Sequence, residues 1–240
     1  MAFLYEQKFA TLLVLFLRFF DRRRSIDEAL PNRLWVTRQR LAVLRQAGFI
    51  ASQRVYTQAQ GLYLLTPRGY EMLRCNRQVM LDKEPVRVVD FRYFEHDRRV
   101  TLCRVALERQ GKCLKWHSDR YLRLKRGFPL DSGKFFKLPD TVIADGVFVS
   151  SKNERVAFEL EHTPKKRERY EDKRFHYLKL LEGSDSSLSG GVPALQRVLL
   201  VASTDRIGKD LQEYFGIHPR FQILSFESLV GGCLGKEALS

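Results

Sequence analysis

The sequence predicts a mixed α/β protein, of the α+β kind, built from two domains joined by a linker. The chain has 240 residues, which is enough for two modest domains that each bury a hydrophobic core. Residues 1–82 show helical periodicity followed by a hairpin pattern, whereas residues 94–240 alternate strand-like and helical runs. Between them, residues 83–93 lose this periodicity and contain Pro85, so they are predicted to be the linker.

The first domain is predicted to open with two helices. Residues 4–20 are strongly apolar and predict the first helix. Ser25 and Glu28 have the spacing of a capping box, which predicts a short second helix from about Ile26. Pro31 is expected to end that helix, because a proline inside a helix removes a backbone hydrogen bond.

The third predicted helix has an apolar face and a basic face. It runs from Arg33 to a stop at Gly48, and its apolar face is formed by Leu34, Leu41, Leu44 and Ala47. The opposite face carries side chains that can reach base edges or phosphates of DNA, namely Arg33, Thr37, Arg38, Arg40 and Arg45. This face, together with Arg54 in the run that follows, is the predicted DNA-binding surface.

A β-hairpin and a fourth helix are predicted next. Residues 49–56 and 61–66 are β-prone runs around a polar turn, and Thr66 before a proline predicts a capped helix start. The pattern resembles a winged-helix domain, because the segment of residues 44–50 is followed by a hairpin that ends in residues 63–69. This resemblance implies that the third helix is a recognition helix for DNA. Winged helices also dock proteins, and exposed arginines also solvate helix faces, so protein docking stays open as the alternative.

The charge balance points to a polyanionic partner. The chain carries 42 lysines and arginines against 28 acidic residues, a net charge of +14. Nucleic acid is favoured over an anionic membrane, because the cations are mostly arginines dispersed through periodic segments. The apolar run 9–20 is too short to cross about 30 Å of hydrocarbon and is interrupted by Arg18, so no membrane insertion is expected.

The cysteines and the first residues favour a cytoplasmic location. The four cysteines form no C-x-x-C pair and have no histidine at zinc-ligand spacing, which predicts reduced thiols. The opening segment lacks a cationic region and a small-residue cleavage site, so secretion is not expected.

The second domain is predicted to hold a mixed central sheet with helices on both faces. Its helical patterns cover residues 94–109, 164–181 and 205–215. Its strand-like runs cover residues 113–116, 121–124, 141–149, 155–160, 196–202 and 221–226.

Two of these strands carry the candidate chemistry. Because side chains alternate along a strand, Glu159 and Glu161 point to the same face. If the two strands pair as a hairpin, Asp145 lies beside them. Three converging carboxylates repel one another unless a cation neutralises them, and oxygen-only ligands suit Mg²⁺ or Mn²⁺. Lysines on the following helix, at positions 165, 166 and 173, can add a positive contact; in the alternative interpretation the glutamates face solvent and pair with arginines.

Four consecutive features resemble the PD-(D/E)xK restriction-endonuclease core in its replication-relaxation variant. They are Asp145-Gly146, a hairpin, the segment of residues 158–163, and a helix with Lys173 and Tyr177. That variant is joined to an amino-terminal winged helix, and the group it most resembles is the mobilisation relaxases related to the plasmid protein MobC. The resemblance implies a metal-dependent nicking enzyme. The family's acidic motif, which would hold the metal ion, falls on Asp145, Glu159 and Glu161. Lys165 or Lys173 on the following helix is expected to steady the phosphate, so the predicted catalytic residues are these three with Lys165 and Lys173.

The same resemblance implies partners. These are double-stranded plasmid DNA at an origin of transfer, other mobilisation proteins and a type IV coupling protein. The chain departs from the nuclease pattern at Glu161, where that pattern has lysine, so the lysine is absent or supplied from elsewhere.

Other functions stay open. A non-catalytic relaxosome accessory protein, or a replication or transcription regulator, fits the same two domains, whereas a protein-interaction adaptor fits the basic charge less well. Tyr170 and Tyr177 lie seven apart on one helix face, but no histidine cluster accompanies them as in tyrosine-dependent relaxases. The chain has no G-x-x-x-x-G-K-[ST] loop, so ATP-driven action is not expected.

Overall fold

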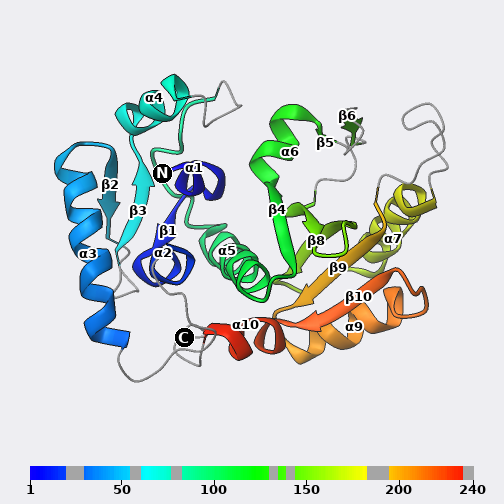
Figure 1. The fold of residues 1–240 in the computed structure, drawn as a ribbon. Helices are drawn as coiled ribbons and strands as arrows, with labels where there is room; N and C mark the ends of the chain where they lie inside the picture. The colour runs from blue at the N-terminus through cyan, green and yellow to red at the C-terminus, as the bar shows by residue number, and fades with distance from the viewer. Residues whose placement is uncertain are drawn as a thin grey trace. The chain divides into compact units, whose positions relative to one another are not determined.

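The computed structural model describes residues 1–19, 30–54, 61–76, 83–129, 135–138, 144–182 and 195–234. The chain divides into two compact units (Figure 1). Unit 1 comprises residues 1–109 and 233–240, and unit 2 comprises residues 110–232. Helices and strands occur in both, so the predicted mixed α/β class is confirmed. None of the helices in the described segments is long and apolar enough to cross a membrane.

Unit 1 is mainly helical with one small sheet. Its elements in chain order are α1 (Ala2–Gln7), β1 (Ala10–Thr11), α2 (Leu12–Phe19), α3 (Leu30–Gln46), β2 (Ile50–Gln53), β3 (Leu62–Leu65), α4 (Pro67–Cys75) and α5 (Phe94–Arg109). The three strands form an antiparallel sheet in the order β1-β3-β2. Thr11 pairs with Leu62 on one side of β3, and Ile50 pairs with Leu65 on the other.

The single opening helix predicted for residues 4–20 is wrong. Two helices stand there, because Lys8 adopts a left-handed backbone with φ 67° and Ala10 then pairs with Tyr63. The second predicted helix, from Ile26, lies outside the described residues. The helix α3 already includes Pro31 in its first turn, where a missing N–H leaves no intrahelical hydrogen bond unmade.

The predicted helix stop and helix cap around the hairpin are confirmed. Gly48 takes φ 74° two residues after the end of α3, a conformation that favours glycine. The Thr66 hydroxyl accepts a 3.0 Å hydrogen bond from the Gly69 N–H and donates one of 2.6 Å to the Gly48 carbonyl. One side chain therefore fixes the start of α4 against the end of α3.

Helix α5 has the bounds that the sequence predicted, but it packs in unit 1. Arg104 pairs with Glu6 at 2.8 Å, and Lys8 pairs with Asp97 at 3.0 Å. Its apolar face is buried at Val100, Cys103 and Leu107. The division between the units therefore falls after residue 109, which differs from the predicted linker at residues 83–93, although that linker holds no strand and no helix.

Unit 2 is built on a five-stranded mixed sheet. Its elements are β4 (Cys113–Ser118), α6 (Asp119–Lys125), β5 (Gly127–Pro129), β6 (Phe135–Lys137), β7 (Gly146–Ser150), β8 (Arg155–Glu161), α7 (Arg167–Glu182), β9 (Arg197–Ala202), α9 (Asp205–Phe215), β10 (Phe221–Ser225) and α10 (Phe226–Leu234). The sheet order is β10-β9-β8-β7-β4, with β7 antiparallel to both neighbours and the other pairs parallel. The predicted mixed sheet is therefore present.

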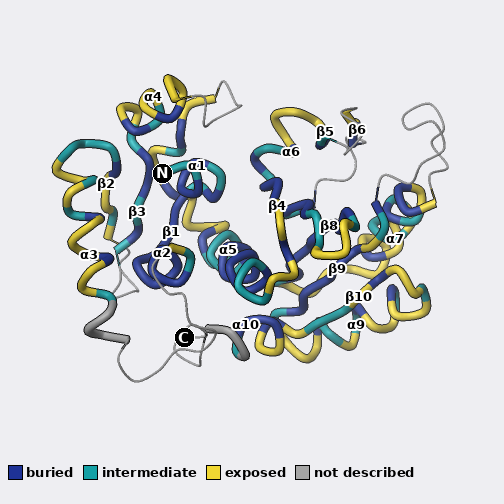
Figure 2. The backbone as a smooth tube through the Cα atoms, viewed as in Figure 1, coloured by how far each residue is buried: buried dark blue, intermediate teal, exposed yellow. Residues whose placement is uncertain are grey.

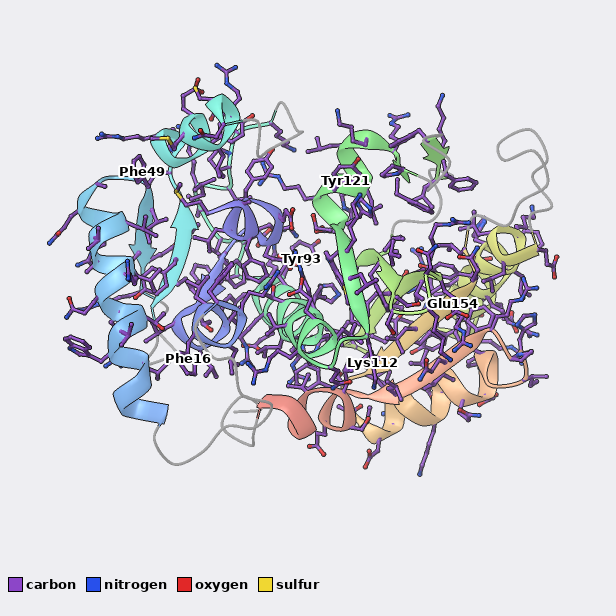
Figure 3. The ribbon with its side chains drawn as sticks, viewed as in Figure 1. Phe16, Phe49, Tyr93, Lys112, Tyr121 and Glu154 are labelled. Atoms are coloured by element: carbon purple, nitrogen blue, oxygen red, sulfur yellow. The ribbon has the colours of Figure 1, made fainter. Side chains whose placement is uncertain are left out.

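One strand prediction in unit 2 is wrong. Residues 121–124 belong to the helix α6, on which Tyr121 is labelled in Figure 3. The Ser118 hydroxyl caps this helix by accepting a hydrogen bond of 3.3 Å from the Tyr121 N–H. The short pair β5–β6 and the helix α10 were not predicted.

The core of unit 2 lies between the sheet and the helices α7 and α9. Tyr170, Tyr177 and Phe215 are fully buried there against Ala157 and Leu200 of the sheet. The strand β8 is the third of the five strands in the sheet, and all seven of its residues are buried (Figure 2). The face of β8 that bears Ala157 is therefore the face that α7 covers.

Candidate active site and DNA-binding face

The strand β8 holds the two predicted glutamates under α7. Glu159 and Glu161 follow Ala157 at alternate positions, so all three side chains point to the helix-covered face. The two glutamates are only 6 % and 1 % exposed. Buried carboxylates need compensating charge or hydrogen bonds, and both are provided by α7 and the loop before it.

A lysine on α7 binds both glutamates. The Lys173 ammonium donates a 2.9 Å hydrogen bond to Oε2 of Glu159 and a second, shorter one to Oε1 of Glu161. The ammonium of Lys165 lies 3.0 Å from the other oxygen of Glu161. The predicted lysines 165 and 173 are therefore both at the site, each as an ion-pair partner of Glu161.

The tyrosine Tyr177 completes the surroundings of Glu159. It lies one turn after Lys173, and its hydroxyl donates a 2.5 Å hydrogen bond to Oε1 of Glu159. The sequence did not predict this contact, but the four-residue spacing from Lys173 is the pattern that places both side chains on one helix face. Glu159 is thereby bound through both of its carboxylate oxygens.

Asp145 lies just before β7 and is tied to β8. The last paired residues of the β7–β8 ladder are Gly146 and Phe158, so Asp145 is one residue beyond it. Its side-chain Oδ2 accepts a 2.8 Å hydrogen bond from the Leu160 N–H. Its charge also acts on Glu159, whose pKa it helps to raise. The predicted hairpin therefore brings Asp145 to the two glutamates.

Gly146 is required by the packing of the strand next to β7. A Cβ atom at this position would lie 2.3 Å from Cζ2 of Trp116 on β4. A real Cβ atom does not approach a ring that closely, so the indole occupies the space that any other residue would fill. The Asp145-Gly146 pair thus combines a charged group with a packing requirement.

Burial and neighbouring charges shift the pKa values in this cluster. Burial raises the pKa of Glu159, the charge of Lys173 opposes the shift, and the charges of Asp145 and Glu161 add to it. Burial alone would lower the pKa of Lys173, but the two glutamates outweigh it and the pKa is raised. Lys173 is therefore a permanent cation at neutral pH.

The carboxylates predicted to hold Mg²⁺ or Mn²⁺ have protein partners in the structure. Within the described residues, no group of three or more His, Cys, Asp or Glu side chains is placed to hold a metal ion. Both oxygens of Glu159 are engaged by Tyr177 and Lys173, and one oxygen of Asp145 is engaged by a backbone N–H. The Lys173 ammonium supplies the positive charge that a metal ion would bring.

The two tyrosines of α7 are unsuited to nucleophilic attack. Tyr170 and Tyr177 are 1 % and 0 % exposed. Burial raises the pKa of both hydroxyls, and for Tyr177 the neighbouring charge of Glu159 raises it further. Neither hydroxyl is therefore exposed at the surface of unit 2, where DNA would be met.

The predicted DNA-binding residues divide into exposed and buried ones. Arg38, Arg40 and Arg45 on α3, and Arg54 after β2, are exposed. Thr37 is fully buried, so its assignment to the DNA-facing surface is corrected: it lies four residues before the buried Leu41, on the same side of the helix. The side chain of Arg33 lies outside the described residues.

Comparison with known protein-family models, with curated proteins and with solved structures gives no match to this chain.

Proposed function

We propose that the chain binds DNA and nicks one strand, as a relaxase of the mobilisation type that its motifs resemble. The observation that carries this proposal is the convergence of Glu159, Glu161 and Lys173 at the end of a β-hairpin, with Asp145 next to it. Acidic residues with a lysine at one buried point suit chemistry on a phosphodiester, in which charge develops on phosphate oxygens.

Unit 1 supports the DNA-binding part of the proposal. The order α1-β1-α2-α3-β2-β3-α4, with the sheet order β1-β3-β2, is compatible with a winged helix in which α3 is the recognition helix. Three exposed arginines lie on α3, and the chain has a net charge of +14. Both features favour a polyanion as partner.

The residues of unit 2 suggest roles in hydrolysis. The Lys173 ammonium can stabilise negative charge on a phosphate, and Lys165, which is 39 % exposed, can meet a phosphate at the surface. Glu159 holds a proton more readily than an ordinary carboxyl because burial raises its pKa, which suits a group that exchanges protons. The burial of both tyrosines favours attack by water over a covalent protein–DNA intermediate.

A second candidate function is that of a non-catalytic DNA-binding protein, such as a relaxosome accessory factor or a regulator. The observation that favours it is the full set of ion pairs around the glutamates. Lys173 binds both of them and Lys165 pairs with Glu161, so the acidic cluster is neutralised within the protein. A cluster neutralised in this way has a structural role, because its ion pairs hold α7 on the sheet.

The resemblance also suggests the setting. We propose a cytoplasmic protein that acts at a plasmid origin of transfer, with other mobilisation proteins and a type IV coupling protein as partners. Mg²⁺ or Mn²⁺ is the cofactor that the resemblance implies, so the nicking assay is run both with and without the metal ion.

Incubation of the full chain with supercoiled plasmid that carries a candidate origin tests the two functions. Appearance of open-circular DNA, with Mg²⁺ or Mn²⁺ or in EDTA, and its loss in Glu159→Gln, supports the nicking enzyme. A gel-shift assay on the same DNA is the matched control for binding. Equal DNA binding by both proteins without any open-circular product supports the accessory role.

A further inference from the structure

The exposed face of α3 carries a stripe of apolar and amide side chains. Trp35, Val36 and Val43 are 59 %, 46 % and 61 % exposed. Gln39 and Gln46 are exposed as well. Large apolar side chains that share one exposed helix face indicate a surface that a partner covers.

The stripe lies opposite the buried face of the helix. Successive residues turn by about 100°, so Gln39 and Val43 lie roughly 40° and 80° around the helix from Trp35. Thr37 and Leu41, at 0 % and 6 % exposure, lie on the other side. The stripe is therefore the part of α3 that projects furthest from the body of unit 1.

The exposed arginines flank this stripe on both sides. By the same helical geometry, Arg40 lies on one edge of it, and Arg38 and Arg45 lie on the other. Arg45 is held toward the sheet by a hydrogen bond of 3.4 Å from its guanidinium to the Ser52 hydroxyl. A row of uncharged side chains between two cationic edges matches a DNA groove, with base edges at its floor and phosphates on its walls.

The chemistry of the stripe matches A·T base pairs. A glutamine side chain can bind N6 and N7 of adenine with two hydrogen bonds, and methyl groups pack on the thymine methyl group. We propose that α3 reads A·T pairs in the major groove through Gln39 and Val43, while Arg38, Arg40 and Arg45 bind the flanking phosphates. This inference rests on the proposed DNA binding of unit 1 and adds its sequence preference.

Charge favours DNA over a second copy of the chain as the occupant of this surface. The sequence of α3 contains four arginines and no acidic residue. A symmetric contact between two copies of α3 would bring these arginines together without a counter-charge, at a cost in repulsion. DNA supplies one negative charge per phosphate at the same edges.

Binding of the full chain to three synthetic duplexes tests the inference. The duplexes are alternating dA-dT, alternating dG-dC and alternating dA-dU, the last of which lacks the thymine methyl group, and fluorescence anisotropy measures the affinity. The wild type is expected to bind the dA-dT duplex roughly 5- to 150-fold more tightly than the dG-dC duplex. Gln39→Ala is expected to remove this preference, and Val43→Ala is expected to remove the difference between dA-dT and dA-dU.

Arg40→Ala is the matched control on the same helix, and it is expected to weaken binding to all three duplexes by the same factor. Absence of binding to any duplex overturns the DNA-binding function itself. Binding without an A·T preference, or a preference that survives Gln39→Ala, overturns the base-reading role while DNA binding stands. A Trp35→Ala variant that changes sedimentation from dimer to monomer, with unaltered DNA binding, assigns the surface to a second copy and also overturns it.

Discussion

The hydroxyl of Tyr177 donates a 2.5 Å hydrogen bond to the carboxylate of Glu159, eighteen residues earlier in the chain. Both side chains are buried, so this contact joins α7 to the central strand of unit 2 in a place that water does not reach. The strength of such a contact comes from the charge of the acceptor and from the low local dielectric. It ties the stability of unit 2 to the acidic cluster.

Tyr177→Phe is expected to lower the free energy of unfolding by about 1–3 kcal/mol, because a buried carboxylate oxygen loses its donor while the ring is kept. Urea denaturation measures the change. Tyr93→Phe, at a position that is 58 % exposed, is the control and is expected to stay within roughly 0.5 kcal/mol of the wild type. Equal effects of the two substitutions would show that the hydroxyl contributes nothing at position 177.

Lys173→Met is expected to destabilise the protein by about 3–5 kcal/mol at neutral pH, since two buried carboxylates lose the cation that they share. Thermal unfolding measures the loss. Added Mn²⁺ is expected to recover part of it in this variant, because a divalent ion can then lie between the two glutamates. A variant that is as stable as the wild type, or that ignores Mn²⁺, would contradict this account of the site.

Glu159→Gln is expected to change how stability depends on pH. Burial raises the pKa of Glu159 above its ordinary value of 4.5, so the folded protein holds this proton more tightly than the unfolded chain. The stabilising contribution of the carboxyl is therefore full below pH 4.5 and is lost as the pH rises through the raised folded pKa. The wild type is expected to lose stability relative to the glutamine variant over this window. Denaturant titrations at a series of pH values measure the free energy of unfolding of both proteins. The same pH dependence in the two proteins would contradict a raised pKa of Glu159.

Gly146→Ala is expected to cost about 1–3 kcal/mol, because the new methyl group collides with Trp116 in a packed layer. Gly208→Ala is the matched control. Gly208 lies in α9, where the nearest atom to an added Cβ is the Ala202 Cβ at 3.7 Å, and alanine is expected to stabilise this helix by roughly 0.5–1 kcal/mol. Calorimetric melting of both variants measures the two changes in stability. A Gly146→Ala variant as stable as the wild type would mean that the Trp116 ring can move aside at little cost.

The double substitution of Arg38 and Arg40 by alanine is expected to flatten the salt dependence of DNA binding. Each lost phosphate contact lowers the slope of log affinity against log salt by roughly 0.9, so a decrease of about 1.8 is expected. Affinity measured over a series of NaCl concentrations gives the slope. An unaltered slope with weaker binding would assign these arginines to a role other than phosphate contact.

Strong local patterns allowed parts of the fold to be predicted. The bounds of α5 and α9 were predicted correctly. Helix α9 has one clear apolar face and a Thr204 cap, whereas α5 is buried all round over residues 100–107. The break between α1 and α2 was missed, because it depends on Ala10 and Thr11 pairing with a strand fifty residues away. The helix α6 was read as a strand from its apolar residues, although the cap at Ser118 is a signal in the sequence that could have corrected it.

The residues of the acidic cluster were predicted, but the hydrogen bonds and ion pairs that they form were not. Strand alternation put Glu159 and Glu161 on one face, and the hairpin brought Asp145 beside them. The distance between the Lys173 ammonium and both carboxylates depends on how α7 crosses the sheet, which no local pattern specifies. Thr37 was assigned to the wrong face because it is polar, although its spacing from Leu41 is that of a buried position.

The side chain of Asp145 accepts a hydrogen bond from the backbone N–H of Leu160, at the point where β7 and β8 separate. This aspartate therefore has a structural role in holding the two strands together. An alanine at this position would leave an amide without its acceptor, and the resulting loss of function could come from a frayed hairpin as easily as from missing chemistry. Asparagine keeps an oxygen acceptor and removes only the charge. Comparison of Asp145→Asn with Asp145→Ala is therefore the means of telling fraying from a chemical defect in this protein.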